Sequence, residues 1–80
     1  MEERKEVLEK VIEFAARAYK KEVSEINENT KITEELGGQS MQRVALSASI
    51  ENEYDVMIPV ATMGKFETIG DLVDHVVDEM

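Results

Sequence analysis

TIGDLVDHVVDEM, residues 68–80, carries the clearest helical pattern of this chain. Its apolar residues lie three, one, three, one and three positions apart, so they share one face of an α-helix. Thr68 can cap the first turn, and Asp71 completes an acidic variant of the capping box. We therefore expect a final helix with one buried stripe, in which Gly70 costs about 1 kcal/mol relative to alanine. The stripe consists of Ile69, Leu72, Val73, Val76, Val77 and Met80.

Two further helices are expected upstream, and both need a partner for their apolar faces. The first runs from residue 2 to about residue 21, with apolar residues at spacings of three and four. The second runs from about Ser40 to Glu53. Pro59 then stops regular structure, and residues 60–65 fit one short helical turn. The second helix has two apolar ridges, one with Met41, Val44 and Ala48 and the other with Leu46, Ile50 and Tyr54.

Residues 22–38 read as a long loop, because turn-forming residues replace the helical pattern. We expect Ile26, Ile32 and Leu36 to pin this loop to the core and Gly37-Gly38 to end it. The fold class is therefore all-α: a small bundle of three main helices and one short helix, with a long first loop, in a single domain over residues 1–80. Four aromatic residues are expected in the core: Phe14, Tyr19, Tyr54 and Phe66.

The composition excludes several classes of function. The 80 residues include eighteen acidic and nine basic side chains, so the net charge is −9. Such a surface repels nucleic acid and anionic lipid, and it attracts basic protein patches. The apolar runs are too short to span a membrane, and the N-terminus lacks the apolar region of a signal peptide. We expect a cytoplasmic monomer that binds neither nucleic acid nor membrane, and the absence of cysteine agrees with that location.

The pattern does not favour catalysis or metal binding. His75 is the single histidine, so a metal site would lack nitrogen ligands and a serine nucleophile would lack a base. The carboxylates do not follow the spacing of a calcium loop either. We expect His75, beside Asp74 and Asp78, to be a solvated surface residue, and we expect no enzyme activity.

The segment LGGQSM, from Leu36 to Met41, is the strongest candidate for a functional site. It places a serine where the long loop ends and a helical pattern begins. The first N–H groups of a helix lack intrahelical partners and lie at the positive end of the helix dipole, so they favour a phosphate. A phosphate ester on Ser40 would be stabilised there. The alternative is that Ser40 only caps the helix.

This segment resembles the phosphopantetheine attachment motif of acyl and peptidyl carrier proteins, whose pattern is close to Leu-Gly-x-x-Ser-Leu. The resemblance extends over about residues 30–77. It implies an acyl-carrier-protein-like fold and a 4'-phosphopantetheine arm on Ser40, donated by coenzyme A. Beyond the motif it rests on Ile50-Glu51-Asn52-Glu53-Tyr54-Asp55, on Ile58-Pro59 and on Phe66-Glu67-Thr68-Ile69-Gly70-Asp71-Leu72.

The resemblance implies a carrier of acyl intermediates, held as thioesters, in fatty acid, polyketide or related biosynthesis. The implied partners are a phosphopantetheinyl transferase and acyl-transferring, condensing and modifying enzymes. An aminoacyl or peptidyl carrier of non-ribosomal synthesis is the first alternative, and Gly37-Gly38 favours it. The length and acidic balance favour the acyl carrier. An alternative of another class is a helical adaptor that is never modified.

Partner docking is expected close to the arm. The resemblance places Gln39 where the family usually has Asp and Met41 where it usually has Leu. The family often has acidic residues early in the second helix, but this chain has Gln42, Arg43 and Ala45, which suggests dedicated partners. Val44 fits either a docking surface or the core, and we favour the core. The candidate docking residues are Gln39, Met41, Val44, Glu51 and Glu53.

Ser47 lies where the family usually places an apolar residue that faces the bundle interior. An inward hydroxyl would make a cavity for a long acyl chain smaller or more polar. The alternative, which we favour, is that the hydroxyl bonds back to its own helix.

Overall fold

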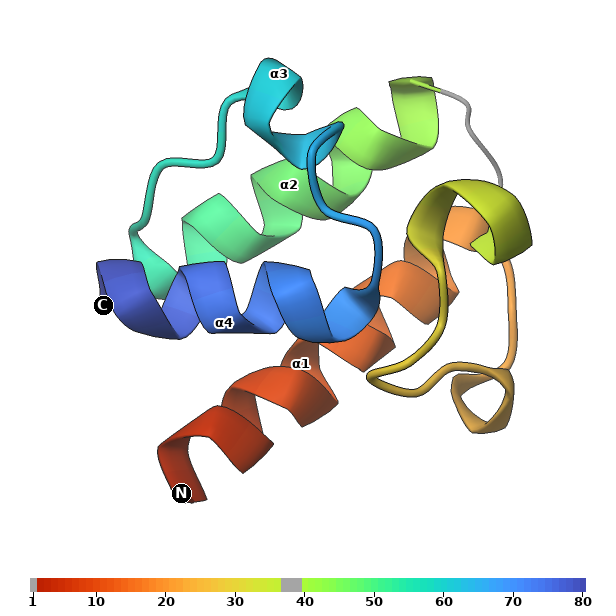
Figure 1. The fold of residues 1–80 in the computed structure, drawn as a ribbon, viewed down its shortest axis with the longest axis horizontal. Helices are drawn as coiled ribbons and strands as arrows, with labels where there is room; N and C mark the ends of the chain where they lie inside the picture. Colours follow the sequence, from red (N-terminus) through yellow and green to blue (C-terminus); the bar gives the residue numbers. More distant parts are fainter. Residues whose placement is uncertain (1, 37–39) are drawn as a thin grey trace.

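A computed structural model describes residues 2–36 and 40–80 of this chain, and Figure 1 shows them as a bundle of helices. The predicted three main helices and one short helix are confirmed. The segment predicted as a loop also contains a 3-10 turn, η1, and a π-helical turn, η2. None of the described helices combines the length and apolar character needed to cross a bilayer. In chain order the elements are α1 (Glu2–Tyr19), η1 (Val23–Glu25), η2 (Ile32–Leu36), α2 (Ser40–Tyr54), α3 (Val60–Met63) and α4 (Ile69–Glu79).

The core lies where α1 packs against both α2 and α4 (Figure 1). The apolar stripes predicted for α1 and α4 are largely buried there, and Val11 and Val76 are fully inaccessible. Tyr19 is buried as predicted. At the end of α4 the stripe reaches solvent, because Met80 is exposed and Val77 only half-buried. The other three aromatic residues are partly buried against this core: Phe14, Tyr54 and Phe66.

Only one of the two apolar ridges predicted for α2 is buried. Leu46 and Ile50 are inaccessible, whereas Met41 is 82% exposed and Val44 is 46% exposed. The expectation that Val44 packs in the core is therefore wrong. The short helix α3, which also packs on α2, is only four residues long. The ridge that begins at Met41 is left to solvent, and Ala48 is exposed with it.

Two helices end in left-handed residues that are not glycine. Lys20 has a φ of 56° and follows α1, and the N–H of Lys21 donates to the carbonyl of Ala16 at 2.9 Å, as in a Schellman motif. Asp55 has a φ of 55° and follows α2, and its N–H donates to the carbonyl of Glu51 at 2.8 Å. These motifs satisfy carbonyl groups that a helix end leaves open. They also fix the end of α1 at Tyr19, before the predicted end at residue 21.

The first loop is joined to the start of α4 by backbone hydrogen bonds. The N–H of Ile32 donates to Glu67 at 2.8 Å, and the N–H of Ile69 donates to Thr30 at 3.0 Å. Ile26 and Ile32 are buried, as predicted, while the side chain of Leu36 and the pair Gly37-Gly38 lie outside the described residues. The loop is therefore a packed part of the fold that pairs with the chain's last helix.

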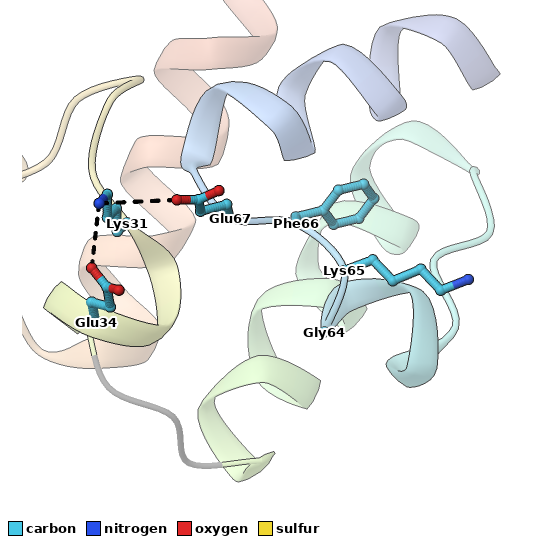
Figure 2. Close-up of a pocket in the computed structure, with 6 residues that line it drawn as sticks. All are labelled: Lys31, Glu34, Gly64, Lys65, Phe66 and Glu67. Atoms are coloured by element: carbon cyan, nitrogen blue, oxygen red, sulfur yellow. Dashed lines mark ion pairs between the residues drawn. The ribbon is translucent and has the colours of Figure 1, made fainter.

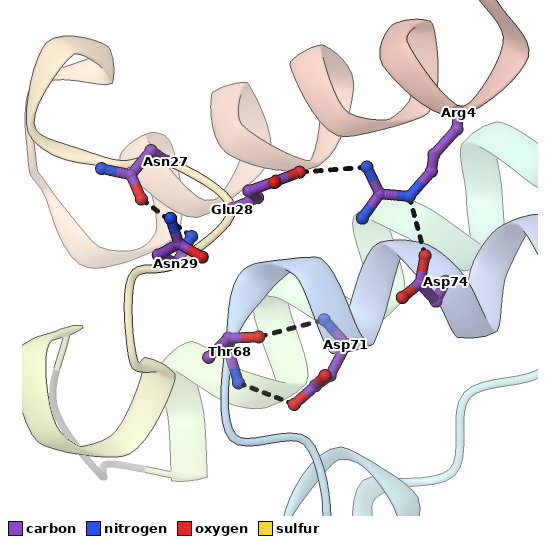
Figure 3. A network of polar contacts seen from close by, with 7 residues as sticks. All are labelled: Arg4, Asn27, Glu28, Asn29, Thr68, Asp71 and Asp74. Atoms are coloured by element: carbon purple, nitrogen blue, oxygen red, sulfur yellow. Dashed lines mark hydrogen bonds and ion pairs between the residues drawn. The ribbon is translucent and has the colours of Figure 1, made fainter. Parts of the chain in front are cut away.

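Side chains reinforce this junction, as Figure 3 shows. The capping box predicted for α4 is present: Asp71 N–H donates to Thr68 Oγ1 at 3.1 Å, and Thr68 N–H donates to Asp71 Oδ2 at 3.2 Å. Arg4 of α1 reaches Asp74 with Nε at 2.7 Å and Glu28 with Nη1 at 3.0 Å. Hydrogen bonds to Asp74 and then to Glu28 raise the pKa of the guanidinium. Arg4 thus connects α1, the first loop and α4.

Candidate functional site

The candidate site lies at the start of α2. The helix begins at Ser40, as predicted, so Ser40 stands where the backbone N–H groups have no helical partner. The first turn contains no acidic residue that could occupy the positive end of the helix dipole. The side chain of Ser40, and Gln39 before it, lie outside the described residues. The described backbone therefore provides a helix start that suits a phosphate ester.

An exposed apolar surface follows Ser40 directly along α2. Met41 and Val44 are one helical turn apart, and Ala45 and Ala48 continue the exposed surface. We call these four residues the α2 ridge. The first acidic residue after Ser40 is Glu51, near the other end of the helix. The surface beside the candidate attachment point is therefore apolar, with the positive charge of Arg43 between its members and no nearby carboxylate within α2.

Tyr19 connects the end of α1 to this part of α2. Its ring is buried, and its hydroxyl has no hydrogen-bond partner within the described residues. Burial raises the pKa of this hydroxyl, and the positive charge of Arg43 opposes that change. The charge of Arg43, in the first turn of α2, therefore acts on the Tyr19 hydroxyl at the end of α1.

Ser47 combines the two possibilities that the sequence left open. The residue is only 4% exposed, so it faces the packed interior. Its Oγ donates to the carbonyl of Val44 at 3.1 Å, so the hydroxyl is satisfied by its own helix. A satisfied hydroxyl can be buried at little cost. The Ser47 hydroxyl is therefore a polar group in the interior beside α2, and its hydrogen bond is made within the helix.

The two acidic docking candidates have different surroundings. Glu51 is half-buried, and its Oε2 accepts the backbone N–H of Ile58 at 2.7 Å. Glu53 is exposed. Glu51 thus holds the connection between α2 and α3 in place, a role that no local sequence signal indicated because its partner lies seven residues away. Glu53 has the more accessible carboxylate for a partner.

A hollow of about 270 Å³ lies between η2 and the link from α3 to α4 (Figure 2). Lys31 lies on one side of the hollow, with its Nζ 3.5 Å from Oε2 of Glu34 and 3.9 Å from Oε1 of Glu67. Lys65 points away from that group in Figure 2. The sequence analysis predicted no site here, although it expected Phe66 in the core. The ion pairs of Lys31 with Glu34 and Glu67 are exposed and therefore weak, and they form no evident acid-base pair for chemistry. The lining residues are Lys31, Glu34, Gly64, Lys65, Phe66 and Glu67.

His75 is not the solvated residue that we expected. It is half-buried, and its ring centroid lies 5.2 Å from that of Phe66, with the rings tilted by 49°. Nε2 is buried and has no partner within the described residues. The difference arises because Phe66, in the link before α4, covers that face of the helix. Among the residues that the structure describes, no group of three or more histidine, aspartate or glutamate side chains could hold a metal ion.

Comparison with known proteins identifies the family to which this arrangement belongs. The sequence model of the family described as "phosphopantetheine attachment site" matches residues 9–76. The chain belongs to this family. The phosphopantetheine family is defined by a covalently attached prosthetic group, so the match confirms the resemblance and the expected cofactor.

Relatives from distant organisms agree with this assignment to the phosphopantetheine family. An acyl carrier protein of Thermotoga maritima is 29% identical over 95% of this chain and 94% of its own length. One from Porphyromonas gingivalis is 30% identical over 89% of this chain and 91% of its own. One from Cyanidioschyzon merolae is 31% identical over 89% and 78%, respectively. The acyl carrier function implied by the resemblance is thus confirmed. The protein is a carrier and does not itself act as an enzyme.

Proposed function

We propose that the Ser40 hydroxyl is the atom that carries the phosphopantetheine arm. The observation that supports this most directly is the start of α2 at Ser40, inside the region matched by the family model. Free N–H groups and the helix dipole favour the phosphodiester there, and no acidic side chain of the first turn competes with it. The residues present therefore fit the prosthetic group.

The bound arm supplies a thiol, which this chain lacks because it has no cysteine. The role of the protein is to position and present the thioester on that thiol. A tether of this kind raises the effective concentration of the acyl group at a docked enzyme to about the millimolar range. Residues 1–80 would act as one carrier domain, which we expect to be a cytoplasmic monomer.

We assign partner docking to the α2 ridge, with Gln39 before it and Glu53 at the far end of the helix. Met41 and Val44 offer exposed apolar contacts next to Ser40. Because acidic residues are absent from α2 before Glu51, attraction between charges contributes less at this point than the net charge of the chain suggests. The partners would be a phosphopantetheinyl transferase and acyl-transferring, condensing and modifying enzymes of fatty acid, polyketide or related biosynthesis.

The attachment site is tested by incubation with coenzyme A and a phosphopantetheinyl transferase of broad specificity, followed by intact-mass measurement. We expect the mass of one arm on the wild type and none on Ser40→Ala. Ser49→Ala is the matched control, since Ser49 lies on the same helix, and it should be loaded like the wild type. Wild type that gains no mass, or Ser40→Ala that still gains it, would reject the assignment.

The pair Gly37-Gly38 is more typical of peptidyl carriers, so a peptidyl carrier is the alternative against which the acyl carrier is tested. The two candidates differ in the enzyme that loads the thiol. An acyl carrier should accept acyl groups from an acyl ligase, whereas a peptidyl carrier should accept aminoacyl groups from an adenylation domain. The names of the relatives support the first outcome.

A further inference from the structure

We propose that Met41 is a site of reversible oxidation, and that its sulfoxide weakens the docking of α2 to partner enzymes. The proposal rests on the proposed function of Ser40 and adds a form of regulation to the same site. Exposure separates the described methionines clearly. Met41 is 82% exposed, Met57 73% and Met80 53%, whereas Met63 is only 1% exposed.

The position of Met41 distinguishes it from the other exposed methionines. It follows the candidate attachment residue directly and forms the first member of the α2 ridge, one turn before Val44. Met57 lies beyond the end of α2, in the connection to α3, and Met80 ends the chain. An enzyme that reaches the arm on Ser40 must approach Met41. It need not approach Met57.

The chemistry requires a peroxide, which we name as the oxidant. A lone pair of the thioether sulfur attacks one peroxide oxygen, the sulfur-oxygen bond forms and the oxygen-oxygen bond breaks. With hydrogen peroxide the second oxygen leaves as water, so sulfur loses two electrons and the peroxide gains them. Methionine sulfoxide reductases reverse the step, because two thiols become a disulfide and the sulfoxide oxygen leaves as water.

The sulfoxide changes the character of the ridge without changing the fold. Oxidation converts a flexible apolar side chain into a polar one. A docked partner would have to desolvate the sulfoxide at an apolar contact that offers it no hydrogen bond. Because this costs binding free energy, the rate of loading falls about tenfold. The core is unaffected because the Met41 side chain contributes little to it, while the buried Met63 is protected from the oxidant.

The experiment uses the full chain, hydrogen peroxide, coenzyme A and a broad-specificity phosphopantetheinyl transferase. The protein is oxidised until the exposed Met41, Met57 and Met80 are modified and Met63 is not, as read by mass spectrometry of peptides, and the peroxide is then removed. Wild type and Met57→Leu should lose about tenfold in the kcat/KM of arm transfer, and a sulfoxide reductase should restore it. Met41→Leu should load at the same rate before and after oxidation.

Three results would overturn the proposal. Equal loading of oxidised and reduced wild type would show that the sulfoxide does not matter. An equal loss in Met41→Leu would place the effect at another residue. Loss of helical circular dichroism on oxidation would attribute the effect to the fold. If the reduced protein takes up no arm at all, it is the proposed function of Ser40 that fails, so the two failures are distinguishable.

Discussion

The carbonyl oxygen of Glu28 accepts the N–H of Gly70 at 2.8 Å, and a Cβ atom on Gly70 would approach that same oxygen to 3.0 Å. Gly70 therefore lets the first loop approach α4 closely without displacing that oxygen. Its position in a helix appeared unfavourable from the sequence alone. The packing requirement explains why a residue of low helix propensity occupies the first turn.

We expect Gly70→Ala to destabilise the protein. The gain in helix propensity is about 1 kcal/mol. The clash with a backbone oxygen, which cannot rotate away as a side chain can, costs about 1–3 kcal/mol. The midpoint of urea unfolding should fall, while the exposed control Asp78→Ala on the same helix should leave it nearly unchanged. A higher midpoint for Gly70→Ala would contradict the contact.

Removal of the Glu51 carboxylate should loosen the connection between α2 and α3. Glu51→Ala leaves the N–H of Ile58 without its acceptor, and a buried unsatisfied donor costs about 1–3 kcal/mol. Glu51→Gln retains an acceptor oxygen and should recover most of that loss. Glu53→Ala, two residues away and exposed, is the control and should change the thermal midpoint little. Equal effects of Glu51→Ala and Glu53→Ala would argue against the structural role.

Glycine should stabilise the end of α1 more than the end of α2. Lys20 and Asp55 both adopt positive φ, but the left-handed region is better tolerated by aspartate than by lysine. We expect Lys20→Gly to raise the free energy of unfolding by about 0.5–1 kcal/mol. Asp55→Gly should gain less. Chemical denaturation of both variants checks the order, and a loss of stability in Lys20→Gly would be inconsistent with the observed helix end.

The stability of the protein should fall in alkaline solution through Tyr19. Burial raises the pKa of its hydroxyl in the folded state, so the folded protein holds this proton more tightly than the unfolded one. The contribution of the protonated Tyr19 hydroxyl to folding stability is complete below the ordinary tyrosine pKa of about 10. It is lost as the pH rises through the higher pKa of the folded state. Tyr19→Phe should reduce that alkaline loss. At neutral pH it should not destabilise, because the hydroxyl has no hydrogen-bond partner in the described part of the chain.

Local pattern was sufficient for the helices and for the position of Ser40. The spacing of apolar residues predicted α1, α2 and α4, and the capping box at Thr68 fixed the start of the last helix. Each of these features depends on residues within a few positions of one another. The backbone start of α2 could therefore be predicted, whereas the attachment of an arm to its first residue stays a prediction.

The errors concern contacts between different elements of the chain, which the pattern of a single helix does not reveal. Val44 was assigned to the core, but it is 46% exposed, because a different face of α2 packs inward. His75 was assigned to the surface because its neighbours are acidic, but Phe66 folds over it. The role of Glu51 was missed for the same reason. Periodicity reveals that a face is apolar, and only the packing decides which face is covered.

The pairing of the first loop with the start of α4 also bears on how the chain folds. The N–H of Ile69 donates to the carbonyl of Thr30, which lies in the opposite half of the sequence, and contacts between remote segments slow the assembly of small domains. The three main helices can begin to form from local interactions. We expect the first turn of α4 to form late, when the first loop packs against it and supplies acceptors for the N–H groups of Ile69 and Gly70. The docking of this loop, which joins α1 to α2 and is the longest connection in the chain, would then limit the rate of the final folding step.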